Sequence, residues 1–462
     1  MAIFEHRART LRETLSISFP LMLTSLSIYL IYVIDRFVLT FYSLDALNAA
    51  VQASTLTWAF WGGITVIAGL SEVFVAQYQI DRRLELGRAT WNAIWISLAA
   101  SVILIPVALL AAKRIYNPGS TEYEYFFLAM PFGVFQPLSY ALTSFFVGRG
   151  RLRLILLLTA ATTVGNAALD YTLVFGIFPC FPPLGAKGGA LAGGISMFLQ
   201  SAVLFLLFLK KNNRITCGTG EWRPRLNVLI KSIRIAAPLV ILYNLELWGW
   251  SLFYTMMAGS SHIHITISSL CQGLIFLFTF ISEGLYRGTL LQINSCLAQG
   301  REKQLLKIFA SASIILGAFL VVQLAVLAIS PKLYLISVSP LTDELLSLLP
   351  TFKTCTRLVL LYLLFQGIQW LLWGFLCAIG QTMSMLIAGS AGLFICLVLP
   401  TYLLIQCYNY SVEWAWGIVV FYSAACCLIY GFIMSRYRKK QSAGRSIIED
   451  PTPQIQLADK VG

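Results

Sequence analysis

The sequence has 462 residues, of which 58% are hydrophobic and only 11% are charged. Soluble domains carry about 25% charged residues, so a soluble globular domain is excluded. The net charge of +13 does not indicate nucleic-acid binding, because the basic residues fall in short clusters between apolar runs.

Apolar runs recur along almost the whole chain, and many approach the ~20 residues that cross a bilayer as a helix. Inside lipid only helices and closed barrels satisfy every backbone polar group, and these runs are continuous rather than alternating, which favours helices. The first run, 15–34, follows a basic patch, but it is too long for the apolar part of a signal peptide. We therefore expect it to be an uncleaved first span.

Twelve spans are predicted, near residues 15–39, 47–75, 90–112, 124–147, 153–178, 187–209, 233–258, 264–290, 306–330, 345–376, 383–405 and 412–435. The longest interior polar stretch, 210–231, divides these spans six and six. The predicted organisation is an N-terminal segment 1–14, an N-lobe 15–209, a linker 210–232, a C-lobe 233–435 and a polar tail 436–462.

Basic residues predict the orientation. One side of the predicted spans carries the N-terminus and the basic clusters at 82–88, 149–153, 210–234, 301–307 and 436–440. The other side carries only Lys113, Arg114, Lys187, Lys332, Lys353 and Arg357. By the positive-inside rule both termini are cytoplasmic. We expect a multi-pass protein of the bacterial inner (plasma) membrane.

The two halves resemble each other. Span one begins SISFPLMLTSLSIYL and span seven begins RIAAPLVILYNLELW, each with a proline (Pro20, Pro238) in its first turns. Both halves start inside and have six predicted spans, so the repeat is parallel, about an axis along the membrane normal. Such halves can rock around a central cavity.

Two acidic residues fall at similar depth in the first half. Asp35 lies about 20 residues into span one and Asp170 about 17 into span five, which puts both in the outer half of the membrane at ~1.5 Å per residue. Asn166 shares the helix face of Asp170, four residues earlier. These residues are candidates for sharing a small cation or a proton. The alternative is that Asp35 only pairs with Arg36 near the external surface.

Glu246 lies near the middle of span seven, flanked by Asn244 and Trp248 in YNLELWGW. A carboxylate at mid-membrane is hard to explain by packing and indicates a functional role. Glu72, Glu283 and Arg287 lie near span ends, where snorkelling to the interface explains them.

Other polar features have simpler explanations. Amides inside the spans either line an aqueous cavity or bond neighbouring helices: Gln136, Gln200, Gln272, Gln366 and Gln369. The glycine-rich stretch 185–190 lacks the context of a phosphate loop and indicates close helix packing at the start of span six. His262 and His264 have no third ligand nearby and are expected to be exposed loop residues rather than a metal site.

Several stretches, in order and at matching spacing over about residues 10–440, resemble the multidrug and toxic compound extrusion (MATE) family of the MOP superfamily. They are FPLMLTSLSIYLIYVIDRFVLTFYSLDALNAA, NAALDYTLVFGIFPCFPPLGAKGGALAGGIS, WRPRLNVLIKSIRIAAPLV and GIQWLLWGFLCAIGQT. The resemblance implies an all-α fold of two six-helix lobes. It also implies that Asp35, Asn166 and Asp170 form an N-lobe cation site, with Glu246 as the C-lobe carboxylate.

The chain departs from the family pattern at three places. Arg36 stands where the family has a small polar residue, which works against cation binding at Asp35. Gln366 stands where one branch has an aspartate, which puts a C-lobe sodium site in doubt, and residues 79–81 replace a glycine-bearing turn.

The sequence thus predicts a secondary active antiporter that exports amphipathic or cationic small molecules by alternating access, driven by protons or sodium. We expect a monomer that needs no cofactor and binds no nucleic acid. A flippase for a lipid-linked oligosaccharide or peptidoglycan precursor is the nearest alternative, but the intramembrane charges here are mainly acidic and favour a cationic partner. An integral-membrane enzyme would need a catalytic constellation, which this sequence does not show. A channel is a third alternative, and its flux would neither saturate nor need an ion gradient.

Overall fold

The computed structural model describes residues 2–69, 71, 83–177, 182–224, 226–299, 301, 304–329 and 346–442. Every regular element among them is helical, and they group into two compact units. Unit 1 holds the described residues of Met1–Tyr29 and those from Leu270 onward, and unit 2 holds those of Leu30–Ser269. Helices α1 (Ala2–Tyr42) and α11 (His262–Ala298) contribute residues to both units.

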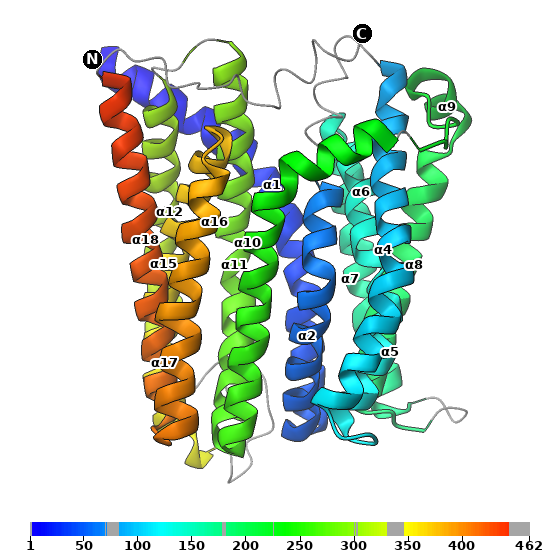
Figure 1. Ribbon diagram of the computed structural model, residues 1–462, viewed down its shortest axis with the longest axis vertical. Coiled ribbons are helices and arrows are strands. Elements are labelled where there is room, and N and C mark those ends of the chain that lie inside the picture. The colour runs from blue at the N-terminus through cyan, green and yellow to red at the C-terminus, as the bar shows by residue number, and fades with distance from the viewer. Residues whose placement is uncertain are drawn as a thin grey trace. The chain divides into compact units, whose positions relative to one another are not determined.

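The helices of unit 2 run mostly side by side, apart from the short α9 and the oblique first part of α10 (Figure 1). They are α2 (Leu44–Gly69), α4 (Leu86–Ile115), α5 (Thr121–Phe132), α6 (Phe135–Gly148), α7 (Leu152–Phe175), α8 (Ala186–Phe208), the short α9 (Lys211–Cys217) and α10 (Leu226–Ser260), with a 3-10 turn η1 (Arg83–Glu85).

Unit 1 contains α12 (Leu305–Ile329), α15 (Leu349–Ala378), α16 (Thr382–Gly392), η3 (Leu393–Val398), α17 (Leu399–Thr401), η4 (Tyr402–Cys407) and α18 (Val412–Ser442). Its core includes a cluster in which Met22 of α1 packs with Leu285 of α11, Leu316 of α12 and Leu371 of α15. The beginning of α1 and the end of α18 lie at the same end of this unit (Figure 1).

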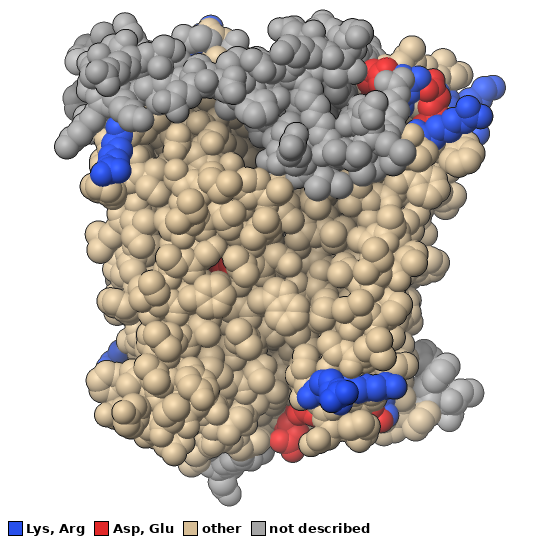
Figure 2. Space-filling view, viewed as in Figure 1, with Lys and Arg blue, Asp and Glu red and all other residues tan. Residues whose placement is uncertain are grey.

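Each of the twelve predicted spans falls on one helix or on successive helical elements over most of its described length. Ten helical stretches among the described residues are long and apolar enough to cross a membrane, which confirms a multi-pass membrane protein. In Figure 2 the visible face over the middle of the helices is tan apart from one small red spot, and most blue and red atoms gather near the helix ends. Such a band matches the hydrocarbon core of a bilayer.

Predicted spans two and seven correspond to α2 and α10, which are not among those ten stretches. Helix α2 is rich in hydroxyl side chains, and these are satisfied within the helix. The Thr57 hydroxyl donates to the Ala53 carbonyl at 2.9 Å and the Thr65 hydroxyl donates to the Trp61 carbonyl at 2.9 Å. Bonding to the carbonyl one turn earlier lets a polar side chain lie in an apolar surrounding.

Helix α10 approaches α2 closely at two glycines. A Cβ on Gly62 would lie 2.0 Å from Leu247 Cδ1, and the Gly63 backbone N–H donates to Asn244 Oδ1 at 3.1 Å. Small residues at such a crossing let two helices pack backbone to backbone. This contact explains why α10 groups with α2 in unit 2.

Candidate functional site

Asp35 and Arg36 form a buried ion pair in unit 2. Arg36 Nη1 lies 2.8 Å from Asp35 Oδ2, and the two side chains are 5% (Arg36) and 11% (Asp35) exposed. The other guanidinium nitrogen, Nη2, donates to the Ser54 hydroxyl of α2 at 2.8 Å. The guanidinium also lies 5.7 Å from the centre of the Trp58 ring, where a cation–π attraction contributes. The pair is therefore held by α2 and is not a loose surface contact.

The second Asp35 oxygen, Oδ1, faces α8. A Cβ on Gly189 would lie 2.7 Å from this oxygen, so only a glycine leaves room for the carboxylate. The neighbouring Gly188 packs on the backbone of α7, where its Cβ would lie 2.7 Å from the Leu173 carbonyl. The predicted close packing at the start of span six is thereby confirmed.

Asn166 and Asp170 lie one turn apart on the buried face of α7, and each is 0% exposed. Asp35 and Arg36 both act electrostatically on Asp170. The structure therefore brings the three residues of the predicted N-lobe site into one cluster. Tyr125 of α5 joins it, because this buried phenol is also within the electrostatic reach of Asp35 and Asp170.

Several polar atoms of the cluster have no hydrogen-bond partner among the described residues. They are Asp35 Oδ1, both side-chain polar atoms of Asn166, and both carboxylate oxygens of Asp170. Burying such groups unpaired costs about 1–3 kcal/mol each, and more when they are charged. Four of the five atoms are oxygens, the ligand type that hard cations prefer, and the two carboxylates could also take up a proton.

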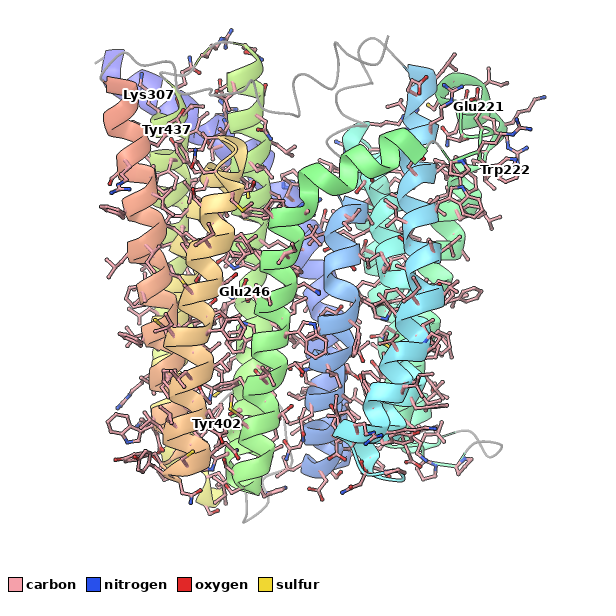
Figure 3. All side chains as sticks on the ribbon, viewed as in Figure 1. Glu221, Trp222, Glu246, Lys307, Tyr402 and Tyr437 are labelled. Atoms are coloured by element: carbon pink, nitrogen blue, oxygen red, sulfur yellow. The ribbon has the colours of Figure 1, made fainter. Side chains whose placement is uncertain are left out.

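The remaining predicted residues of unit 2 lie on separate helices. Glu246 is half-buried midway along α10 (Figure 3), two residues after Asn244, which contacts Gly63. Gln136 is half-buried on α6, and Gln200 of α8 donates to the Thr159 hydroxyl of α7 at 3.5 Å. Gln200 thus bonds two helices, the second of the two roles considered for it.

Three predicted amides lie in unit 1 and are buried. Gln366 donates to the Tyr362 hydroxyl at 3.0 Å, and Gln369 accepts from the Ser423 hydroxyl of α18 at 3.3 Å. Gln272 of α11 is 4% exposed. Glu283 of the same helix is half-buried, accepts a hydrogen bond from Tyr29 and lies within the electrostatic reach of Arg287.

Some of the residues considered in the sequence analysis lie outside the described residues or in another kind of element than expected. Glu72 and residues 79–81 lie outside the described residues. His262 and His264 were expected in a loop, but they form the first turn of α11; His262 Nε2 lies 3.0 Å from Asp45 Oδ1 and His264 Nδ1 lies 2.7 Å from the Ser261 hydroxyl. The sequence analysis did not foresee Ser54 and Trp58 of α2 or Tyr125 of α5 near the acidic cluster, because they lie on helices other than those of Asp35 and Asp170.

No protein-family model matches the chain. Curated relatives include the probable multidrug resistance protein NorM of Neisseria meningitidis serogroup B, 24% identical over 293 residues, which are 60% of this chain and 62% of that protein. The protein of the same description from Rhizobium meliloti is 27% identical over 208 residues, which are 43% of this chain and 41% of the relative. The chain thus matches less than two thirds of the length of either relative.

Solved structures match over nearly the whole chain. The eukaryotic MATE transporter AtDTX14 superposes with a TM-score of 0.76 at 16% identity, covering 98% of both chains. The chain has the MATE fold. The inward-facing conformation of a multidrug resistance MATE family transporter of the MOP superfamily superposes with a TM-score of 0.73 at 14% identity, covering 94% of this chain and 99% of that one. The predicted resemblance to the MATE family is confirmed.

Proposed function

We propose that this protein is a secondary active exporter of amphipathic or cationic small molecules, driven by entry of protons or sodium. The observation that carries the proposal is the buried cluster of Asp35, Asn166 and Asp170. Apart from Asp35 Oδ2, which pairs with Arg36, its side-chain oxygens have no hydrogen-bond partner among the described residues. They lie within a unit that contains helices long and apolar enough to cross a membrane. Ionisable groups at such a place are costly to keep, which favours a role in moving an ion.

The charges of the cluster set how many cations it takes up. With both acids ionised, two carboxylates and one guanidinium leave one net negative charge. One proton or one sodium ion neutralises this charge, and a second would leave the buried site with a net positive charge. Arg36 thus supplies part of the compensation that a mobile ion would otherwise provide, and we propose one coupling cation in each cycle.

Neutralisation of the cluster offers a link to alternating access. When the site is empty of its cation, Asp170 is a buried carboxylate without a hydrogen-bond donor among the described residues. Such a state is destabilised relative to any arrangement that lets water reach the carboxylate. A cation gradient can therefore shift the equilibrium between the inward-open and outward-open conformations, because the cation binds these two conformations with unequal affinity.

The names of the relatives support export as the direction of transport and drug-like compounds as the substrate class. Two of the similar proteins are described as probable multidrug resistance proteins, and one similar structure is of a multidrug resistance transporter. The acidic character of the buried groups favours a cationic substrate, with Glu246 as a candidate for its binding or for a second coupling step. We propose that both termini are cytoplasmic, as the distribution of basic residues predicts.

Reconstitution in liposomes tests the proposal. Purified protein would be assayed for movement of fluorescent cationic dyes while a proton gradient, a sodium gradient or neither is imposed. Dye movement that requires one of the gradients and saturates with dye concentration supports the proposal. Flux that is independent of both gradients would instead indicate a channel, and dye-independent movement of a lipid-linked precursor would indicate a flippase.

A further inference from the structure

Unit 2 contains a pocket of about 220 Å³ at the end of the helices where α6, α7, α8 and α9 meet. One part of its wall is apolar and consists of Phe146, Leu154 and Leu207. The other part is polar and consists of Arg151, Lys210, Asn212 and Asn213. The pocket therefore joins an apolar wall to two cationic side chains, and it is distinct from the buried acidic cluster.

Hydrogen bonds hold the polar wall in place. Arg149 Nη1 donates to Asn213 Oδ1 at 2.9 Å, and Asn213 Nδ2 donates to the Leu207 carbonyl at 2.8 Å. The Arg149 guanidinium also lies 5.1 Å from the centre of the Phe145 ring. Asn213 is 4% exposed, so this link between the end of α6 and α9 is part of the fold.

The two segments that supply the polar wall of the pocket carry charge of one sign. Arg149, Arg151 and Arg153 come from the connection between α6 and α7, and Lys210, Lys211 and Arg214 come from the segment that follows α8. The sequence has no Asp or Glu between 125 and 169 or between 171 and 220. Neither Arg151 nor Lys210 forms an ion pair within the described part of the chain, and both are exposed.

The position of the pocket along the membrane-spanning helices indicates which kind of ligand it could bind. Leu154 lies in the first turn of α7 and Leu207 in the last turn of α8, both of which are membrane-spanning helices by length and composition. The pocket thus lies at the level where lipid headgroups meet the hydrocarbon. Pockets that enclose a drug-sized ligand measure about 300–1,000 Å³, so this one is sized for a headgroup rather than for an exported compound.

We propose that this pocket binds the headgroup of an anionic glycerophospholipid. Arg151 and Lys210 would hold the phosphodiester, and an acyl chain would lie along Phe146, Leu154 and Leu207. Basic pockets between membrane helices on the cytoplasmic side recognise anionic lipids in this way, through charge at the headgroup and apolar contact below it. The ligand is the lipid, because free phosphate would use only the charged half of the wall.

Native mass spectrometry of the full-length protein tests the assignment, with phosphatidylglycerol and phosphatidylcholine of the same acyl chains as probes. The test variant is Arg151→Gln/Lys210→Gln. The matched control is Arg153→Gln/Lys211→Gln, which removes the same charge from the same two segments but outside the pocket. All four substituted side chains are exposed, so we expect both variants to fold.

The expected result is that wild type and the control retain phosphatidylglycerol over phosphatidylcholine, and that the test variant retains at least about tenfold less of it. Inorganic phosphate should not displace the bound lipid. An equal loss of bound phosphatidylglycerol in the test and control variants would overturn the proposal, since it would show that the lipid responds only to the general surface charge. Equal retention of phosphatidylcholine by wild type, or displacement by phosphate, would overturn it as well.

Discussion

At the residue scale, the depth and spacing of polar residues selected Asp35, Asn166 and Asp170, whose role as a cation site stays a prediction. Asn166 and Asp170 follow the helix repeat, and Asp35 was matched to them by its distance from the start of its span. The pairing of Asp35 with Arg36 was considered as an alternative, but the burial of that pair was not predictable. The side chain next to an acid in a helix can turn toward solvent or toward the bundle, and Ser54 and Trp58, which draw it inward, belong to another helix.

Removal of Arg36 tests how the ion pair is held. Arg36→Gln leaves Asp35 without its cation in a buried place, and breaking a buried pair from one side costs about 3–5 kcal/mol. The double variant Asp35→Asn/Arg36→Gln removes both charges, and we expect it to be more stable than Arg36→Gln alone. Thermal unfolding in detergent measures this order. If the double variant is the less stable of the two, the pair is not the main contact of Arg36.

Glu246 gives a second prediction at this scale. Glu246→Gln keeps the size of the side chain but removes the charge midway along α10, so we expect normal expression and altered dye transport. The matched control is Gln200→Ala, which removes an amide from a contact between α7 and α8. Wild-type transport by a well-expressed Glu246→Gln protein would reduce this glutamate to a structural role.

At the scale of elements, apolar runs predicted where helices lie but not where they are interrupted. Predicted span four breaks into α5 and α6 at Gly133, where a Cβ would lie 2.0 Å from Trp61 Nε1. The Trp61 indole occupies that space and donates to the Met130 carbonyl at 3.2 Å. Predicted span eleven contains π-helical turns on either side of Pro400, which cannot donate a backbone hydrogen bond. Neither interruption changes the apolar pattern of the sequence.

The contact between α7 and α8 can be tested with two glycines of one helix. Gly188→Ala places a Cβ 2.7 Å from the Leu173 carbonyl carbon, so the helices must separate; such overpacking costs about 1–3 kcal/mol. Gly193→Ala meets nothing within 4 Å and should stabilise α8 by about 0.5–1 kcal/mol. Chemical or thermal unfolding of the purified variants provides the comparison. Equal effects of the two substitutions would contradict the close packing beside Asp35.

At the scale of the whole molecule, the order of the helical segments followed from the sequence, whereas the contacts between distant segments did not. The linker at 210–232 predicts a division of six and six spans, which stays a prediction. Contacts place α10 with α2 and the first part of α1 with α11 and later helices. Small residues such as Gly62 and Gly63 decide this grouping, and their partners are distant in the sequence.

The orientation of the chain gives a prediction at the same scale. In a background without accessible native thiols, Asn117→Cys and Ile263→Cys should react with an impermeant maleimide added outside intact cells. Gly220→Cys should react only after permeabilisation. All three positions are exposed in the structure, so accessibility depends on the side of the membrane. Labelling of Gly220→Cys in intact cells would contradict the predicted orientation and place this segment outside.

Gradient-driven dye efflux by Asp35→Asn, Asp170→Asn and the double variant, measured against pH in proteoliposomes, tests the central claim most directly. If the two acids act as one titrating unit, each single change abolishes coupled efflux and the double change is little worse, because effects within a cooperating site are not additive. If Arg36 neutralises Asp35 permanently, only Asp170→Asn will abolish efflux. Efflux with wild-type pH dependence in Asp170→Asn would contradict the account.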